Sequence, residues 1–152
     1  MRLLILRHGH AEAEASADNL RALSAEGELE VHSVCQKRCD ELAELELVLH
    51  SPYLRTCQTA DILTQYTPAP KQELDLLVPN ANPKVLIDQL YSLSQKHSCI
   101  ALVSHQPLVG TLVDHLCAFE YGRYRMGTAS LACLKGDPVV SGVCELEWLD
   151  RP

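Results

Sequence analysis

Four consecutive apolar residues, Leu3 to Leu6, run directly into Arg7, His8, Gly9 and His10. An apolar run without polar alternation is typical of a short strand that is buried on both faces, as in a parallel sheet covered by helices. In open α/β sheets, ligands bind beyond the carboxyl ends of the strands. The sequence therefore identifies Arg7 and His8 as the first candidate functional residues.

The rest of the chain repeats this pattern of a short strand followed by a helix. Residues 45–49 and 99–103 are further predicted short strands, and a segment with helical spacing follows each of them. Ser24 is a suitable N-cap for a helix that we expect to continue to about Glu44. The other predicted elements are helices over 53–66, 84–95 and 108–119, a strand or extended loop over 74–78, and closing strands over 129–134 and 143–149. This alternation predicts an α/β protein, a three-layer sandwich with a mostly parallel central sheet flanked by helices.

The length and charge of the chain exclude several classes of protein. Its 152 residues suit one domain over 1–152. A net charge of −7 argues against a nucleic-acid binder that neutralises many phosphates. The apolar runs are far shorter than the roughly 18 to 20 residues that cross a bilayer, so no membrane association is predicted. The first residues lack the features of a signal peptide, and we expect a cytoplasmic protein.

The cysteines and histidines, seven of each, do not form a metal-binding pattern. Cys35 and Cys39 are one helical turn apart, but no second pair at ligand spacing follows them. Most of the cysteines lie on apolar stripes, where a free thiol behaves as a small hydrophobic residue. No two histidines have the short spacing that recurs in zinc sites. A metal site is therefore a minor alternative, and no cofactor is predicted.

Cationic and imidazole side chains follow three of the predicted strands. Arg7 and His8 end the first strand, Arg55 comes after the second, and His105 comes after the third. The Ser-Pro pair at 51–52 is a helix start signal, which places Arg55 in the first turn of a helix. The free N–H groups of such a turn favour a bound anion. If the strands are parallel, the four side chains meet at one edge of the sheet.

Two arginines and two histidines in one crevice suit a dianionic tetrahedral group such as phosphate, because guanidinium forks match phosphate oxygens. Neighbouring cations disfavour protonation of His8 and keep its ring nucleophilic near neutral pH. In-line attack on phosphorus would give a phosphohistidine intermediate that water then hydrolyses. Arg7, Arg55 and His105 would hold the equatorial oxygens. This mechanism requires no metal.

These residues also carry a resemblance to a known family. Residues 6–9 (Leu-Arg-His-Gly), 51–60 (Ser-Pro-Tyr-Leu-Arg-Thr-Cys-Gln-Thr-Ala) and 104–107 (Ser-His-Gln-Pro) resemble, in order, the motifs of the histidine phosphatase (phosphoglycerate mutase-like) superfamily. The compact length and the stretch 18–24 are similar to its SixA-type phosphohistidine phosphatase branch. The resemblance implies a phosphoglycerate mutase-like fold over most of the chain.

The resemblance also implies roles for individual residues. His8 matches the phosphorylated nucleophile, and Arg7, Arg55 and His105 match the phosphate pocket. Arg21 is a further candidate for phosphate or substrate binding, and the alternative is that it only pairs with a neighbouring aspartate. The family often has an acidic or amide residue where this chain has a histidine at position 10, so the sequence leaves the role of that histidine open.

One departure from the family pattern bears on the substrate. Many members that cleave phosphate esters have a carboxylate general acid between the second and third motifs, where this chain offers only Glu73 and Asp75 outside any clear motif. A phosphohistidine can leave as neutral imidazole without such an acid, whereas an alkoxide cannot. The sequence therefore predicts a phosphohistidine phosphatase whose partner is a histidine phosphotransfer domain or phosphocarrier protein. The alternatives are a small-molecule phosphomonoesterase or mutase of the same superfamily, and a non-catalytic phosphate-binding module.

Overall fold

The computed structural model describes residues 1–152, and its centre is a six-stranded sheet in the order β3-β2-β4-β1-β5-β6. Strands β1, β2, β3 and β4 run parallel to one another. Strand β5 pairs antiparallel with β1, and β6 pairs antiparallel with β5 at the edge of the sheet. The strands are β1 (Arg2–Arg7), β2 (Leu47–His50), β3 (Lys71–Glu73), β4 (Cys99–Ser104), β5 (Leu131–Lys135) and β6 (Glu145–Asp150).

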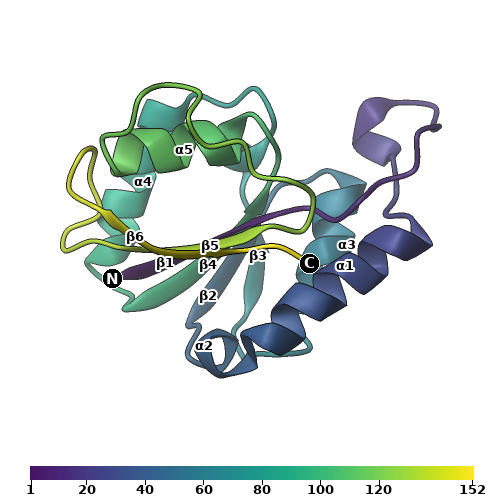
Figure 1. Cartoon of the computed structure of the whole chain (residues 1–152), viewed down its shortest axis with the longest axis horizontal. Coiled ribbons are helices and arrows are strands. Elements are labelled where there is room, and N and C mark those ends of the chain that lie inside the picture. The colour runs from purple at the N-terminus through teal and green to yellow at the C-terminus, as the bar shows by residue number, and fades with distance from the viewer.

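Helices cover both faces of the sheet, so the molecule has three layers (Figure 1). Helices α4 and α5 lie on one face and pack on one row of strand residues that includes Leu3 and Ile5. Helices α1, α2 and α3 lie on the other face and pack on the alternate row, which includes Leu4 and Leu6. The helices are α1 (Ala25–Lys37), α2 (Cys39–Ala43), α3 (Leu54–Leu63), α4 (Pro83–Ser94) and α5 (Leu108–Leu116), with short 3₁₀ helices η1 (Asp18–Leu20) and η2 (Asp75–Leu77). The predicted three-layer sandwich with a mostly parallel sheet is confirmed.

Burial of both strand faces explains the unbroken apolar runs. All six residues of β4 are buried, as are the four central residues of β1. The register pairs Leu3 with Ile100 and Leu6 with Val103, so the two strands end at the same level. Strand β2 pairs with the other side of β4 in the same direction. The carboxyl ends of β1, β4 and β2 therefore lie side by side.

Three element boundaries differ from the sequence prediction. The helix expected over 24–44 is divided at Arg38, whose backbone leaves helical geometry. The guanidinium of Arg38 lies 4.0 Å from the Trp148 ring centre and its Nε donates to Asp150 at 2.5 Å, which ties the helix to the last strand. Strand β3 at 71–73 was not predicted, because its three residues are all exposed and polar. The segment 74–78 forms a 3₁₀ turn rather than a strand.

No helix in the chain combines the length and the apolar character that crossing a membrane would require.

Candidate active site

The structure brings Arg7, His8, Arg55 and His105 together at the carboxyl edge of the sheet. They line a cavity of about 410 Å³. Arg7 ends β1 and His8 follows it, His105 follows β4, and Arg55 lies in the first turn of α3. His8, Arg55 and His105 are 8%, 4% and 1% exposed, so the cavity wall is built from buried charged and polar groups. The convergence predicted from the three strand ends is correct.

The hydrogen bonds of His8 determine which of its ring nitrogens carries the proton. Nδ1 is 2.7 Å from the carbonyl oxygen of Gly9, which can only accept, so Nδ1 must donate. On the other side of the ring, Nε of Arg55 donates to Nε2 at 3.3 Å, so Nε2 must hold a lone pair. Both contacts select the same tautomer. His8 therefore presents an unprotonated Nε2 beside a guanidinium.

The surroundings of His8 keep it neutral. Burial is the main cause that lowers its pKa, from 6.5 to about 4, and the positive charges of Arg55, Arg7 and Arg21 lower it further. The bond to the Gly9 carbonyl acts in the opposite direction but does not outweigh burial. At neutral pH the ring is therefore an available nucleophile rather than a cation.

Arg55 is held from two sides although it is almost completely buried. Its Nη1 donates to the backbone oxygen of Asp18 at 2.7 Å, and its Nη2 lies 3.2 Å from Oδ2 of the same residue. The guanidinium carbon is 5.0 Å from the centre of the Tyr53 ring. Thr59, one turn further along α3, receives the N–H of Gly9 at 3.3 Å and so fixes α3 against the turn after β1. Arg55 is thereby oriented toward His8.

Two buried nitrogen atoms of residues that line the cavity have no partner within the protein. Arg7 donates from Nη1 to the carbonyl of Met126 at 2.7 Å, but its buried Nε is unpaired. His105 bonds through Nε2 to Oγ of Ser51 at 2.8 Å, and its buried Nδ1 is also unpaired. Burial lowers the pKa of His105 to about 3, with smaller contributions from His8 and Arg55, so its ring is neutral. A tetrahedral oxyanion in the cavity would satisfy such donors, since buried polar groups are almost always hydrogen-bonded.

Ser51 has a different role from the one predicted. The N-cap of α3 is Tyr53, and the helix begins at Leu54 rather than at 53. The Ser51 hydroxyl instead positions His105, and it receives only a long bond of 3.4 Å from the N–H of Tyr53. The Ser-Pro pair still marks the start of the helix within two residues, and Arg55 is in its first turn as expected. Nothing in the sequence near Ser51 indicated that its hydroxyl would bond to His105.

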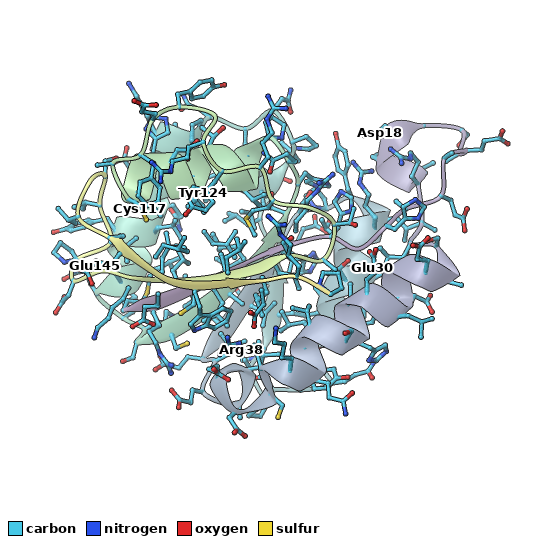
Figure 2. All side chains as sticks on the ribbon, viewed as in Figure 1. Asp18, Glu30, Arg38, Cys117, Tyr124 and Glu145 are labelled. Carbon is cyan, nitrogen blue, oxygen red and sulfur yellow. The ribbon has the colours of Figure 1, made fainter.

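Arg21 also lines the cavity, and the structure shows the aspartate pairing that was its alternative. Its Nη1 lies 3.1 Å from Oδ1 of Asp18, and its Nε donates to the backbone oxygen of Glu12 at 2.7 Å. Asp18 is on the segment that extends beyond the end of α1 (Figure 2). It is the only carboxylate that lines the cavity, and hydrogen bonds from Arg21 and then Arg55 lower its pKa. Asp18 therefore links the two arginines as an ionised group.

Neither carboxylate considered from the sequence as a general acid lies in the cavity. Glu73 is on the exposed edge strand β3 and Asp75 is in η2, and only Pro79 from the whole region 64–98 lines the cavity. No three histidine, cysteine or acidic side chains are grouped so that they could hold a metal ion. All seven cysteines are free thiols. The chemical groups of the cavity are thus two histidines tied to their neighbours, three arginines, Asp18 and His10.

The buried neutral histidines predict acid sensitivity of the fold. Because the pKa of His8 is about 4 in the folded state and near 6.5 when unfolded, the unfolded chain takes up a proton first as the pH falls. The contribution of this group is complete above about pH 6.5 and is lost between there and pH 4, by about 3 kcal/mol. Urea unfolding at pH 7 and pH 4.5 measures this loss. The double variant His8→Asn, His105→Gln should unfold with a much shallower pH dependence in that window, and an equally steep dependence would contradict the assignment.

Comparison with known proteins gives two relatives among curated sequences. Phosphohistidine phosphatase SixA of Escherichia coli strain K12 is 32% identical over 123 residues, which are 79% of this chain and 76% of that protein. A homologue of phosphohistidine phosphatase SixA from Haemophilus influenzae is 29% identical over 126 residues, 76% of this chain and 77% of that protein. No protein-family model matches the chain.

A solved structure agrees over nearly the whole length. The structure of the protein histidine phosphatase SixA complexed with tungstate superposes with a TM-score of 0.91 at 28% identity, and the match covers 99% of this chain and 97% of that one. Tungstate, like phosphate, is a tetrahedral oxyanion. The similarity therefore extends through all the elements that position the cavity.

Proposed function

The chain belongs to the SixA branch of the phosphoglycerate mutase-like histidine phosphatase superfamily, and we propose that it removes the phosphoryl group from a phosphorylated histidine of another protein through a phospho-His8 intermediate. One observation carries this proposal. An imidazole nitrogen fixed in its unprotonated form by Arg55 faces a cavity with unpaired buried donors on Arg7 and His105. This is a nucleophile beside an oxyanion site.

In the first step, Nε2 of His8 attacks phosphorus as the bond from phosphorus to the substrate nitrogen breaks. The Arg55 guanidinium, 3.3 Å from that nitrogen in the free protein, transfers its hydrogen bond to a phosphoryl oxygen. Nε of Arg7 and Nδ1 of His105 are the further donors for the equatorial oxygens. Charge stabilisation and positioning are the main requirements of phosphoryl transfer, and this chain supplies both from buried groups.

The acid–base content of the cavity favours a phosphoramidate over a phosphate ester. An ester needs a proton for its alkoxide leaving group, but the one carboxylate of the cavity, Asp18, is ionised and paired with two arginines. An imidazole whose other nitrogen is already protonated leaves as a neutral molecule. Two relatives are themselves phosphohistidine phosphatases by name. A protein bearing phosphohistidine, either a phosphotransfer domain or a phosphocarrier, is therefore the substrate that we propose.

The proposal is tested by presenting a phosphohistidine-bearing phosphocarrier protein and, separately, a small phosphate ester such as p-nitrophenyl phosphate. Rapid-quench intact mass spectrometry should show a phosphate adduct on the enzyme with the first substrate, together with loss of phosphate from the carrier. We expect kcat/KM for the ester to be lower by at least about 10³-fold, because the cavity has no unpaired carboxylic acid to protonate the alkoxide. Efficient ester hydrolysis with no action on the phosphoprotein would instead support the small-molecule phosphomonoesterase.

A further inference from the structure

His10 is the one titratable side chain of the cavity whose role the proposed function leaves open. It lies two residues beyond His8, is exposed, and lines the same cavity. Its Nδ1 is 2.7 Å from Oγ of Ser24, the residue that caps α1, and its Nε2 has no partner in the protein. The ring is therefore anchored at one nitrogen and open to solvent at the other.

The contacts of the Ser24 hydroxyl determine the tautomer of His10. Ser24 Oγ accepts the N–H of Gly27 at 3.1 Å and lies 3.2 Å from the backbone oxygen of His10, which can only accept. The single hydroxyl proton must go to that backbone oxygen if all contacts are to be satisfied. Nδ1 of His10 is then the donor to Oγ, and in the neutral ring Nε2 carries a lone pair.

Hydrolysis of a phosphohistidine intermediate needs a group that accepts a proton from the attacking water. His8 itself is phosphorylated at that stage. His105 is held neutral with a pKa of about 3, and Asp18 is paired with two arginines, so both are weak bases. The other charged groups in the cavity wall are guanidinium ions. Nε2 of His10 is the remaining imidazole nitrogen of the cavity, and it has no partner in the protein.

We propose that His10 is the general base for the second half of the reaction, an inference that rests on the proposed function. Water attacks phosphorus of phospho-His8, the bond from phosphorus to Nε2 of His8 breaks with its electron pair returning to that nitrogen, and Nε2 of His10 takes one water proton. Hydrogen phosphate leaves, and the imidazolium of His10 then releases its proton to solvent. Atoms and charge balance without any further reactant.

The groups around His10 bear on the pH dependence of this step. Glu30 on α1 accepts the backbone N–H of His10 at 3.0 Å. The remaining charged or titratable groups that share the cavity with His10 are Asp18 and Arg21 of the 11–22 segment, Arg7 and His8 at the end of β1, Arg55 of α3 and His105 after β4. A general base must be unprotonated to accept the proton of water, so breakdown of the phosphoenzyme should speed up as the pH rises.

The variant His10→Asn separates the catalytic role from a structural one. The asparagine amide stands where Nδ1 stands and keeps the bond to Ser24, but it lacks the second, titratable nitrogen. His10→Gln is the companion variant, since its amide reaches the position of Nε2 without being able to accept a proton at neutral pH. Each is exposed to a phosphohistidine-bearing phosphocarrier protein, and the phosphate adduct on the enzyme is followed by intact mass after rapid quench, from pH 5 to pH 8.

In His10→Asn we expect the adduct to form at the wild-type rate but to break down about 100-fold more slowly or worse, with no pH dependence in that range. If the adduct of His10→Asn breaks down at the wild-type rate, the inference is wrong and His10 serves only to support Ser24. Slow breakdown of the adduct in His10→Gln but not in His10→Asn would also overturn the inference. If neither wild type nor variant ever carries phosphate, it is the proposed function that fails, and this result is distinct from the others.

Discussion

Replacing His8 by alanine is expected to lower the turnover of a phosphohistidine protein by at least about 10⁴-fold and to remove the phosphate adduct completely. His105 and the arginines of the cavity cannot substitute for it. His105 has its Nε2 engaged by Ser51, and the arginines are permanently protonated and hence not nucleophilic. Steady-state release of phosphate and rapid-quench mass of the enzyme are the two measurements.

The alanine variant also leaves space for a chemical rescue. The cavity keeps Arg7, Arg55 and His105, so added imidazole can occupy the place of the lost ring and accept the phosphoryl group. We expect millimolar imidazole to restore part of the activity without an adduct on the protein. His32→Ala is a suitable control. His32 lies on α1 and bonds to Tyr66, which follows α3, and neither residue lines the cavity. This variant should retain wild-type turnover. Appreciable activity of His8→Ala without imidazole would exclude His8 as the nucleophile.

Much of the fold was predictable because each central strand is buried on both faces. The unbroken apolar residues of β1 and β4, together with the helical spacing after them, defined the parallel part of the sheet. The elements that were wrong or missed have no such signal. β3 consists of exposed polar residues whose backbone pairs with β2. The interruption at Arg38 coincides with contacts to Trp148 and Asp150, more than 100 residues later.

The site was predictable for a related reason. Parallel strands bring their carboxyl ends to one edge, so Arg7, His8 and His105 had to lie near one another once the sheet was assigned. The contacts that orient these residues were not predictable, because they join distant segments through ordinary residue types. Ser51 bonds His105 across 54 positions, and Asp18 reaches Arg55 across 37. The sequence around such a serine or aspartate does not indicate a hydrogen-bond partner so far along the chain.

Asp18 shows how a loop residue can adjust the site without taking part in chemistry. Its carboxylate neutralises part of the positive charge of Arg21 and Arg55, and its backbone oxygen holds the Arg55 guanidinium at 2.7 Å. The positive charge of these two arginines is therefore only partly balanced before a dianion enters. A phosphoryl oxygen that takes over bonds from Arg55 would compete with this carboxylate, so the 11–22 segment and the substrate are coupled through one arginine.

Arg55→Ala is expected to lower kcat/KM for the phosphohistidine protein by about 10³-fold while the protein remains folded. The guanidinium both fixes the lone pair of His8 and supplies a buried donor to the transferring phosphoryl group, so its removal affects the nucleophile and the transition state together. Arg55→Lys should recover only a small part of the loss, because an ammonium group cannot reach His8 and the phosphoryl oxygens with the same planar geometry.

We expect Arg55→Ala to change the thermal stability of the protein much less than its activity. Burial lowers the pKa of Arg7, and the positive charge of Arg55 lowers it further, since the two cations repel each other. Loss of Arg55 relieves that repulsion and gives up the pairing with the exposed Asp18, so we expect the melting temperature to change by only a few degrees in either direction. Thermal unfolding and kcat/KM, measured on the same preparation, distinguish a catalytic role of Arg55 from a structural one. A large fall in melting temperature with activity within tenfold of wild type would mean that Arg55 is a structural residue and that the phosphate pocket lies elsewhere.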